Sequence, residues 1–256
     1  MSYSRNIDFG LEIARGVVAG HKGFSIPGRK DSVGTVNFED ITQTGNTVLT
    51  RPAGTNIEIV SSSANDDGDI GGPPEGTGVQ TVEIEYLDAS GNEARATFTM
   101  NGTTAVNIGT AVHDIQWIHA VTVGTGGVAA GNIQVRDVAT GAIIYEQINA
   151  GGSQSLSCRY KIPNGKTGYI MGWHVSAVTR KIAFKLRADV NRATRAIQSG
   201  VFVFQDTMVL EQAPSGWIPF DVPLKCPQLS TIKASAISFT GTGDAGAAFD
   251  VILIDN

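Results

Sequence analysis

With 256 residues, the chain can bury the core of one large β domain or two small ones. Its 31 glycines and its charged fraction of 17% favour strands and tight turns and exclude a mainly helical protein. No apolar run reaches the length of a membrane span, and the first residues lack the basic and then apolar pattern of a secretory signal, so we expect neither membrane insertion nor secretion.

Charge is distributed unevenly along the chain. Residues 1–150 contain 8 basic and 17 acidic residues, a net charge of −9, whereas residues 151–256 contain 11 and 7, a net charge of +4. Ends of opposite sign favour head-to-tail contacts between copies, although two domains with different surfaces would give the same pattern. Neither part is basic enough to predict nucleic-acid binding.

Residues 1–53 show little regular pattern and are interrupted by glycine, proline and asparagine. A structureless segment of this length is unusual in a compact domain, but Phe24, Ile26, Phe38 and Ile41 are too apolar for a disordered tail. We therefore expect an ordered N-terminal arm that serves assembly. A more specific form of this prediction is that the arm docks on a neighbouring copy.

Residues 54–150 are expected to form a first β-sandwich domain. The acidic residues 64–78, rich in glycine and proline, predict a long loop. Asn65, Asp67 and Asp69 have the spacing of calcium ligands, but the full EF-hand pattern fails, so a solvated loop is the preferred interpretation. Alternating or apolar runs predict strands at 56–63, 79–88, 93–100, 115–123, 133–138 and 143–148.

A flexible, uncharged stretch at 150–153 predicts the boundary to a second domain at 151–256. Residues 154–190 are expected to form a meander of three strands with one dry side. In its second strand, Tyr169, Met171 and Trp173 share the dry face. In its first strand, alternation assigns four intervening side chains to water, namely those of Ser155, Ser157, Arg159 and Lys161.

The remaining C-terminal residues predict four further strands, at 201–204, around 217–222, at 231–239 and at 247–254. Prolines interrupt the stretch around 217–222, which indicates an edge strand. In the last strand, 247–254, Ile252 and Ile254 make the second face apolar as well, which indicates either a central strand or a contact strand between subunits. The whole predicts an all-β fold, with two antiparallel β-sandwich, jelly-roll-like domains (54–150 and 151–256) preceded by an extended N-terminal arm (1–53).

Reactive side chains do not form a recognisable catalytic motif. The four histidines lack metal-site spacing, and neither a nucleophile elbow nor a phosphate-binding loop occurs, so we expect no enzyme activity, no cofactor and no bound metal. Two cysteines are too few for a disulfide framework and fit buried free thiols. Trp117 and Trp173 lie on apolar strand faces and are expected in the core, whereas Trp217 is expected in a turn (214–217) and is the candidate for stacking on a sugar ring.

Three stretches carry a similarity to a known family: residues 57–66 with 76–78 and 82–88, residues 163–173, and residues 248–256. They resemble structural proteins of tailed-bacteriophage virions. The resemblance spans much of residues 57–256 and includes no catalytic signature. It implies a component of the virion, assembled in the host bacterial cytoplasm, and leaves capsid decoration, the neck or tail collar and the baseplate open.

The expected function is that of a virion protein that associates with copies of itself around a symmetry axis, through strand faces and the arm. The implied partners are other virion proteins, such as the major capsid, portal, neck or tail proteins. Neither nucleic acid nor a membrane is expected as a partner. The alternative is a carbohydrate-binding module of the virion that recognises a host surface glycan, with Trp217 as the contact residue.

Overall fold

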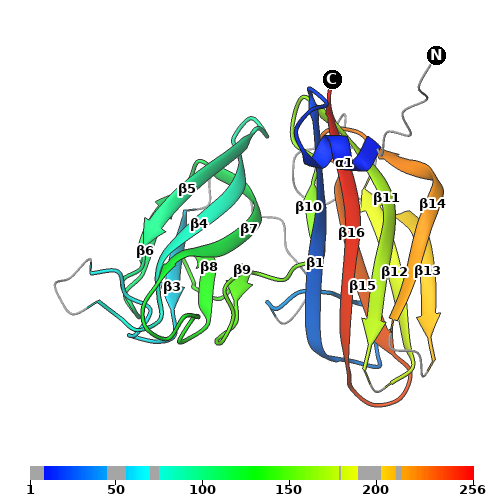
Figure 1. The fold of residues 1–256 in the computed structure, drawn as a ribbon. Helices are drawn as coiled ribbons and strands as arrows, with labels where there is room; N and C mark the ends of the chain where they lie inside the picture. Colours follow the sequence, from blue (N-terminus) through cyan, green and yellow to red (C-terminus); the bar gives the residue numbers. More distant parts are fainter. Residues whose placement is uncertain (1–8, 45–55, 70–74, 179, 190–202, 212–214) are drawn as a thin grey trace.

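The computed structural model describes residues 9–44, 56–69, 75–178, 180–189, 203–211 and 215–256. Almost all regular structure in these ranges is β-strand, which confirms the all-β class. The helix α1 (Phe9–Ala14) is six residues long, and no helix in the described ranges is long and apolar enough to cross a membrane. Figure 1 shows two bodies side by side, which we call the inserted unit (residues 56–150) and the jelly-roll unit (residues 9–44 and 151–256).

The jelly-roll unit consists of two facing antiparallel sheets. One has the strand order β1-β16-β11-β14, and the other has the order β10-β15-β12-β13. This arrangement, in which most successive strands alternate between the sheets and only β12 and β13 pair within one sheet, is a jelly roll. Its strands are β1 (His21–Val33), β2 (Glu39–Asp40), β10 (Arg159–Lys161), β11 (Lys166–Ala177), β12 (Ile182–Asp189), β13 (Val203–Leu210), β14 (Ser215–Cys226), β15 (Thr231–Ser238) and β16 (Gly243–Asp255).

The inserted unit interrupts one edge strand of the jelly roll. β2 pairs with Ser235 and Ala236 of β15, and β10 pairs with residues 231–233 of the same strand. Because β12 occupies the other side of β15, β2 and β10 lie on one edge and act as two halves of a single strand. The chain leaves the jelly roll after the first half, builds the inserted unit, and returns for the second half.

Residues 21–42 belong to the jelly roll, which corrects the expectation of an arm that docks on a neighbouring copy for this part of the chain. β1 pairs along its length with β16 of the same chain. On its other side the Arg29 amide donates to the carbonyl oxygen of Leu156 at 3.1 Å. Gly28 permits this approach, because a Cβ there would lie 2.3 Å from the Cys158 nitrogen. Residues 1–8 and 45–53 of the expected arm lie outside the described residues.

Residues 154–190 do not form the expected meander, because β10 and β12 lie in one sheet and β11 lies in the other. The strands themselves occur where alternation predicts them, but their neighbours come from distant parts of the sequence. The dry side of this segment encloses one core with β16, including Trp173, Phe184 and Phe249. β14 is an edge strand, as its prolines predict, and β16 is central in its sheet.

The inserted unit is a smaller sandwich with its own apolar core. Its two sheets have the orders β6-β3-β8-β9 and β5-β4-β7, and all pairings are antiparallel. Its strands are β3 (Ile57–Ser61), β4 (Val79–Asp88), β5 (Glu93–Thr99), β6 (Val106–Gly109), β7 (Val112–Val123), β8 (Ile133–Asp137) and β9 (Ile144–Ile148).

Candidate functional site

The junction between the two units is built where β7 faces β10. The side-chain amide of Gln116 on β7 donates from Nε2 to the carbonyl oxygen of Lys161 at 2.7 Å, and its Oε1 accepts from the Lys161 amide at 3.0 Å. A strand edge presents such unpaired backbone groups, and β10 has β15 on its other side. One glutamine therefore replaces a neighbouring strand and attaches the inserted unit to the jelly roll.

A buried ionic cluster lies beside this contact. Arg159 Nη2 lies 2.5 Å from Asp114 Oδ2, Lys161 Nζ lies 3.5 Å from the same oxygen, and all three side chains are almost fully buried. Burial alone would raise the pKa of Asp114, but the charges of Arg159 and Lys161 outweigh it and hold this pKa below its ordinary value. Buried ion pairs add little net stability, but they fix a geometry because breaking one leaves a charge without its partner.

A second buried acid at the junction has the opposite behaviour. Glu146 on β9 accepts a hydrogen bond from Ser157 Oγ at 2.6 Å, and Ser157 Oγ lies 2.7 Å from Thr42 Oγ1. Burial raises the pKa of Glu146 from 4.5 to about 7, against the lowering effect of the Ser157 hydrogen bond. The junction therefore contains one carboxylate that is held ionised and one that titrates near neutral pH.

These contacts overturn the expected wet face of the strand at 154–162. Ser155, Ser157, Arg159 and Lys161 are all buried, because the inserted unit covers this face. Alternation assigned the polar side chains to one side correctly, but it could not show that a second polar surface packs against them.

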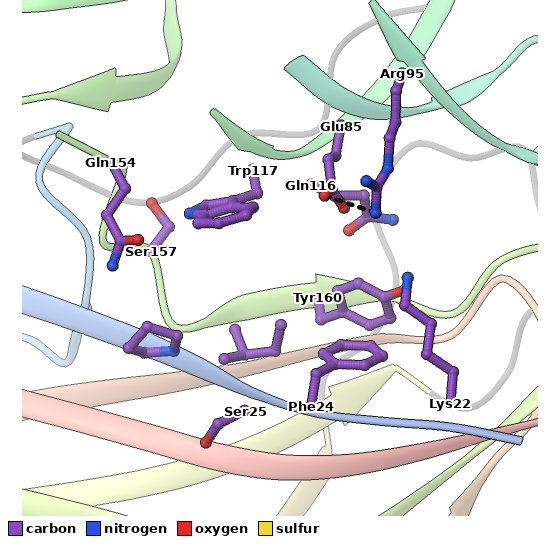
Figure 2. Close-up of a pocket in the computed structure, with 12 residues that line it drawn as sticks. Lys22, Phe24, Ser25, Glu85, Arg95, Gln116, Trp117, Gln154, Ser157 and Tyr160 are labelled. Carbon is purple, nitrogen blue, oxygen red and sulfur yellow. Dashed lines mark ion pairs between the residues drawn. The ribbon is translucent and has the colours of Figure 1, made fainter. Parts of the chain in front are cut away.

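A cleft of about 350 Å³ opens next to the junction, between β1 of the jelly-roll unit and β4, β5 and β7 of the inserted unit. Figure 2 shows Trp117 on one side of the cleft and Phe24 and Tyr160 on the other. Trp117 is partly exposed and stacks on His119 with ring centroids 4.5 Å apart. Phe24 and Tyr160 meet edge to face at 5.0 Å.

Trp117 was expected in the core, and this expectation is wrong. The pairing of β4 with β7 shifts between Glu85 and Tyr86, which lie opposite Trp117 and Ile115, so Gln116 bulges out of the register. A bulge reverses the alternation that follows it. Ile115 and Ile118 consequently face the core, and Trp117 turns to the cleft.

The cleft has a charged end and an uncharged polar end. At the charged end, Arg95 Nη2 lies 2.9 Å from Glu85 Oε1, and Lys22 Nζ lies 3.5 Å from Glu93 Oε1. At the other end, Figure 2 shows Gln154 and Ser157 beside the indole of Trp117. The carboxylates at the charged end are thus paired with cations.

Trp217, the sugar-contact candidate from sequence, lies in β14 and not in a turn. The residue is 44% exposed, and its ring stacks on His174 with centroids 4.0 Å apart. Gly172 leaves room for the indole, since a Cβ there would lie 2.5 Å from Trp217 Cη2. Trp217 borders a shallow groove lined mostly by small residues, and it lies on β14, at the opposite edge of the sheet from β1, which lines the junction cleft.

The four residues of the expected arm all contact the jelly-roll unit. Ile41 is fully buried in its core, and Phe24 and Ile26 pack against that core from β1. The Phe38 ring lies 3.7 Å from Lys185 Nζ. Phe24 and Ile26 also line the junction cleft, so two residues singled out for assembly contribute to this site.

Ile252 and Ile254 are partly buried on the outer face of β16, between β1 and β11. Their apolar character fits the central position of β16. A role in contacts between subunits stays a prediction.

The acidic loop at 64–69 is organised by Asp66, which sequence reasoning passed over. Its carboxylate is fully buried and accepts from the amides of Val79 and Ala130 at 2.8 Å and of Gly131 at 2.9 Å, and from Ser61 Oγ at 2.5 Å. In the described ranges, no three His, Cys, Asp or Glu side chains cluster as metal ligands would. Asp66 therefore fixes the loop through backbone groups.

No protein-family model matches the chain, and no curated protein matches its sequence. Among solved structures, the chain aligns with the infectious bursal disease virus Gx strain at 12% identity and a TM-score of 0.27, covering 92% of this chain and 73% of the other. It aligns with the empty top component of cowpea mosaic virus at 7% identity and a TM-score of 0.20, covering 81% and 84%. A third alignment, with the CBM22 tandem domain of Paenibacillus barcinonensis Xyn10C, has 13% identity, a TM-score of 0.24 and coverage of 93% and 92%. TM-scores this low carry no argument about function.

Proposed function

We propose that this chain is a structural subunit of a virus particle, of the tailed-phage type that its sequence resembles, and that it works by packing against copies of itself. It performs no bond-making chemistry. Its further partners are other proteins of the particle, at the capsid surface or at the neck and tail. Jelly rolls build viral capsids and also lectins, so the fold by itself does not select this function.

The observation that carries the proposal is the opposite charge of two rigidly joined units. Residues 56–150 contain 2 basic and 12 acidic residues, a net charge of −10, and the remaining residues contain 17 and 12, a net charge of +5. The junction of Gln116, Asp114, Arg159 and Lys161 holds these charges at a fixed separation. An object with a fixed acidic end and a fixed basic end favours head-to-tail association, which closes into a ring when the rotation permits.

Apolar side chains at one end of the jelly-roll unit supply an attachment surface for a second copy. Val178 follows β11 and is 76% exposed, and Phe239 follows β15 and is 52% exposed. The Phe239 amide donates to the Lys181 carbonyl oxygen at 3.0 Å, so the two turns are adjacent. Lys181 between these turns is paired with Glu211 at 2.9 Å, so the surface offers apolar area there with no excess charge from Lys181.

Light scattering during size-exclusion chromatography tests this proposal. The wild-type chain should elute as a multimer at low salt and shift towards the monomer at high salt, because salt screens the charges. The double variant Val178→Asp, Phe239→Asp should be monomeric. Val222→Asp, at a 79% exposed position within edge strand β14, is the matched control and should keep the multimer. A wild-type chain that stays monomeric in all conditions would refute the proposal.

A second candidate function, glycan recognition on the particle surface, is favoured by exposed aromatic rings. Trp217 offers one such ring on the outer face of the jelly-roll sheet. If it contacts a host glycan, Trp217→Ala should abolish binding on a glycan array on which the wild-type chain gives a signal. Binding that is unchanged in this variant would rule out Trp217 as the contact.

A further inference from the structure

We propose that the cleft at the junction, and not the surface around Trp217, is a binding site for an uncharged sugar ring. The inference does not depend on self-association. It rests on three features of the cleft: an aromatic stacking face, polar groups that lack an intramolecular partner, and a balanced charge.

The stacking face is the indole of Trp117. One face of this ring is covered by His119, at a centroid distance of 4.5 Å and an interplanar angle of 27°. The ring also lines the cleft, whose opposite wall includes Ile26, Pro27 and Phe24. Figure 2 shows Trp117 on the opposite side of the cleft from Phe24 and Ser25 of β1. A sugar ring that presents C–H groups on one face fits such a slot, since aromatic faces carry negative charge density that attracts C–H groups.

The unpaired polar groups lie at the Gln154 end of the cleft. The side-chain amide of Gln154 and the indole N–H of Trp117 make no hydrogen bond to the described part of the chain. Ser157 and Gln116, in contrast, form hydrogen bonds with Glu146 and Lys161. An amide offers both a donor and an acceptor, as a sugar hydroxyl requires. The backbone beside it is fixed, because the Ser155 amide donates to the Ile118 carbonyl oxygen at 2.8 Å. The amide is thus presented from a rigid support.

The charge of the cleft favours a neutral ligand. Lys22 and Arg95 are each paired with a carboxylate, from Glu93 and Glu85. No excess positive charge remains at these four positions to attract a phosphate, a sulfate or an acidic sugar. A volume of about 350 Å³ lies in the range of small-ligand pockets and accommodates one or two sugar rings.

The cleft exists only while the two units are joined. Its lining comes from β1 and Tyr160 of the jelly-roll unit, from β4, β5 and β7 of the inserted unit, and from Gln154 and Ser157 in the segment that connects the two units. A ligand in it would therefore contact both units and stabilise the junction. This coupling gives a second readout, a rise in melting temperature on ligand addition.

The test uses the full chain on an array of neutral oligosaccharides built from glucose, galactose, mannose and N-acetylglucosamine, beside sialylated and sulfated ones. Affinity for the best neutral oligosaccharide is then measured by isothermal titration calorimetry, which needs no tryptophan reporter, for four proteins: wild type, Trp117→Ala, Gln154→Ala and Trp217→Ala. We expect about a tenfold or greater loss of affinity in the first two variants and no loss in the third. Melting curves of each variant establish that it is folded, and Gln154→Ala keeps the test valid if Trp117→Ala unfolds.

Three results would overturn the inference. The first is the absence of binding to any neutral oligosaccharide. The second is binding that survives both cleft substitutions, including binding that is lost only in Trp217→Ala. The third is a preference for sialylated or sulfated sugars. None of these results bears on whether the chain forms multimers, so the two proposals fail separately.

Discussion

At the scale of single residues, buried polar side chains decide how this chain is put together. Asp66 joins three segments of the inserted unit by accepting four hydrogen bonds on its two oxygens. Asp114 and Glu146 hold the two units together with opposite protonation behaviour. Each of these carboxylates makes directional contacts that apolar side chains cannot make.

Asp66→Asn tests the first of these roles. The substitution replaces one acceptor oxygen with an N–H donor, which would face either the Gly131 amide or those of Val79 and Ala130. We expect a loss of about 2 to 4 kcal/mol in the free energy of unfolding, measured by urea denaturation. Asp67→Asn, in the same loop, is the control and should change the stability little. Equal stability of Asp66→Asn and wild type would contradict the assigned role.

Glu146→Gln tests the protonation of the junction. The folded chain holds this pKa at about 7, above its unfolded value of 4.5, so folding takes up a proton in this range and stability falls as pH rises from 4.5 to 7. Glutamine keeps the oxygen that accepts from Ser157 and removes the titration. Denaturation curves between pH 5 and 8 should show the variant more stable than wild type at pH 8, by up to about 3 kcal/mol.

The exposed substitution Glu211→Gln is the control for this pH series and should leave the wild-type profile unchanged. A Glu146→Gln profile that is parallel to that of the wild-type chain would show that Glu146 does not titrate in this range.

Two β-bulges set the limit of what the sequence predicts about side-chain direction. Alternation assigned Trp117 to the core and placed Met171 on the same face as Trp173. The register shifts at Gln116 and between Ile170 and Gly172 reverse these assignments locally. The position of a bulge depends on pairing with the opposite strand, so residues 115–123 alone do not predict it. The sequence therefore predicted strands well and the cleft tryptophan not at all.

At the scale of elements, the organising feature is one edge strand that is split into β2 and β10. The sequence predicted the position of most strands, and the prolines of β14 correctly indicated an edge. It did not predict that β1 pairs with β16 near the other end of the chain, because pairing depends on contacts across more than 200 residues. The same long-range closure converted an expected arm into the first strand of the jelly roll.

Gln116→Ala tests how β10, the second half of the split strand, is attached to the inserted unit. The substitution leaves the Lys161 amide and carbonyl without the contacts that Gln116 supplies, at about 1 to 3 kcal/mol for each buried unpaired group. We expect the two units to uncouple, with separate transitions in calorimetry and a larger radius of gyration in X-ray scattering. Gln80→Ala, which removes an amide bonded only within the inserted unit, should keep one transition. A single transition in both variants would contradict the junction described here.

At the scale of the whole molecule, two units of opposite charge are joined by buried polar contacts. Such an arrangement gives each copy a defined acidic end and a defined basic end, and the turns after β11 and β15 add apolar contact area at the basic end. Rigid ends that differ in sign are what head-to-tail assembly requires. The sequence showed the uneven charge. It did not show the junction that joins the acidic unit to the basic one.

Electron microscopy of the purified chain in negative stain at low salt tests self-association most directly. The proposal predicts rings or stacks of regular size in which two-lobed copies repeat head to tail, and their loss in the Val178→Asp, Phe239→Asp variant. Fields of separate two-lobed particles at every protein concentration, with wild type and variant indistinguishable, would contradict it.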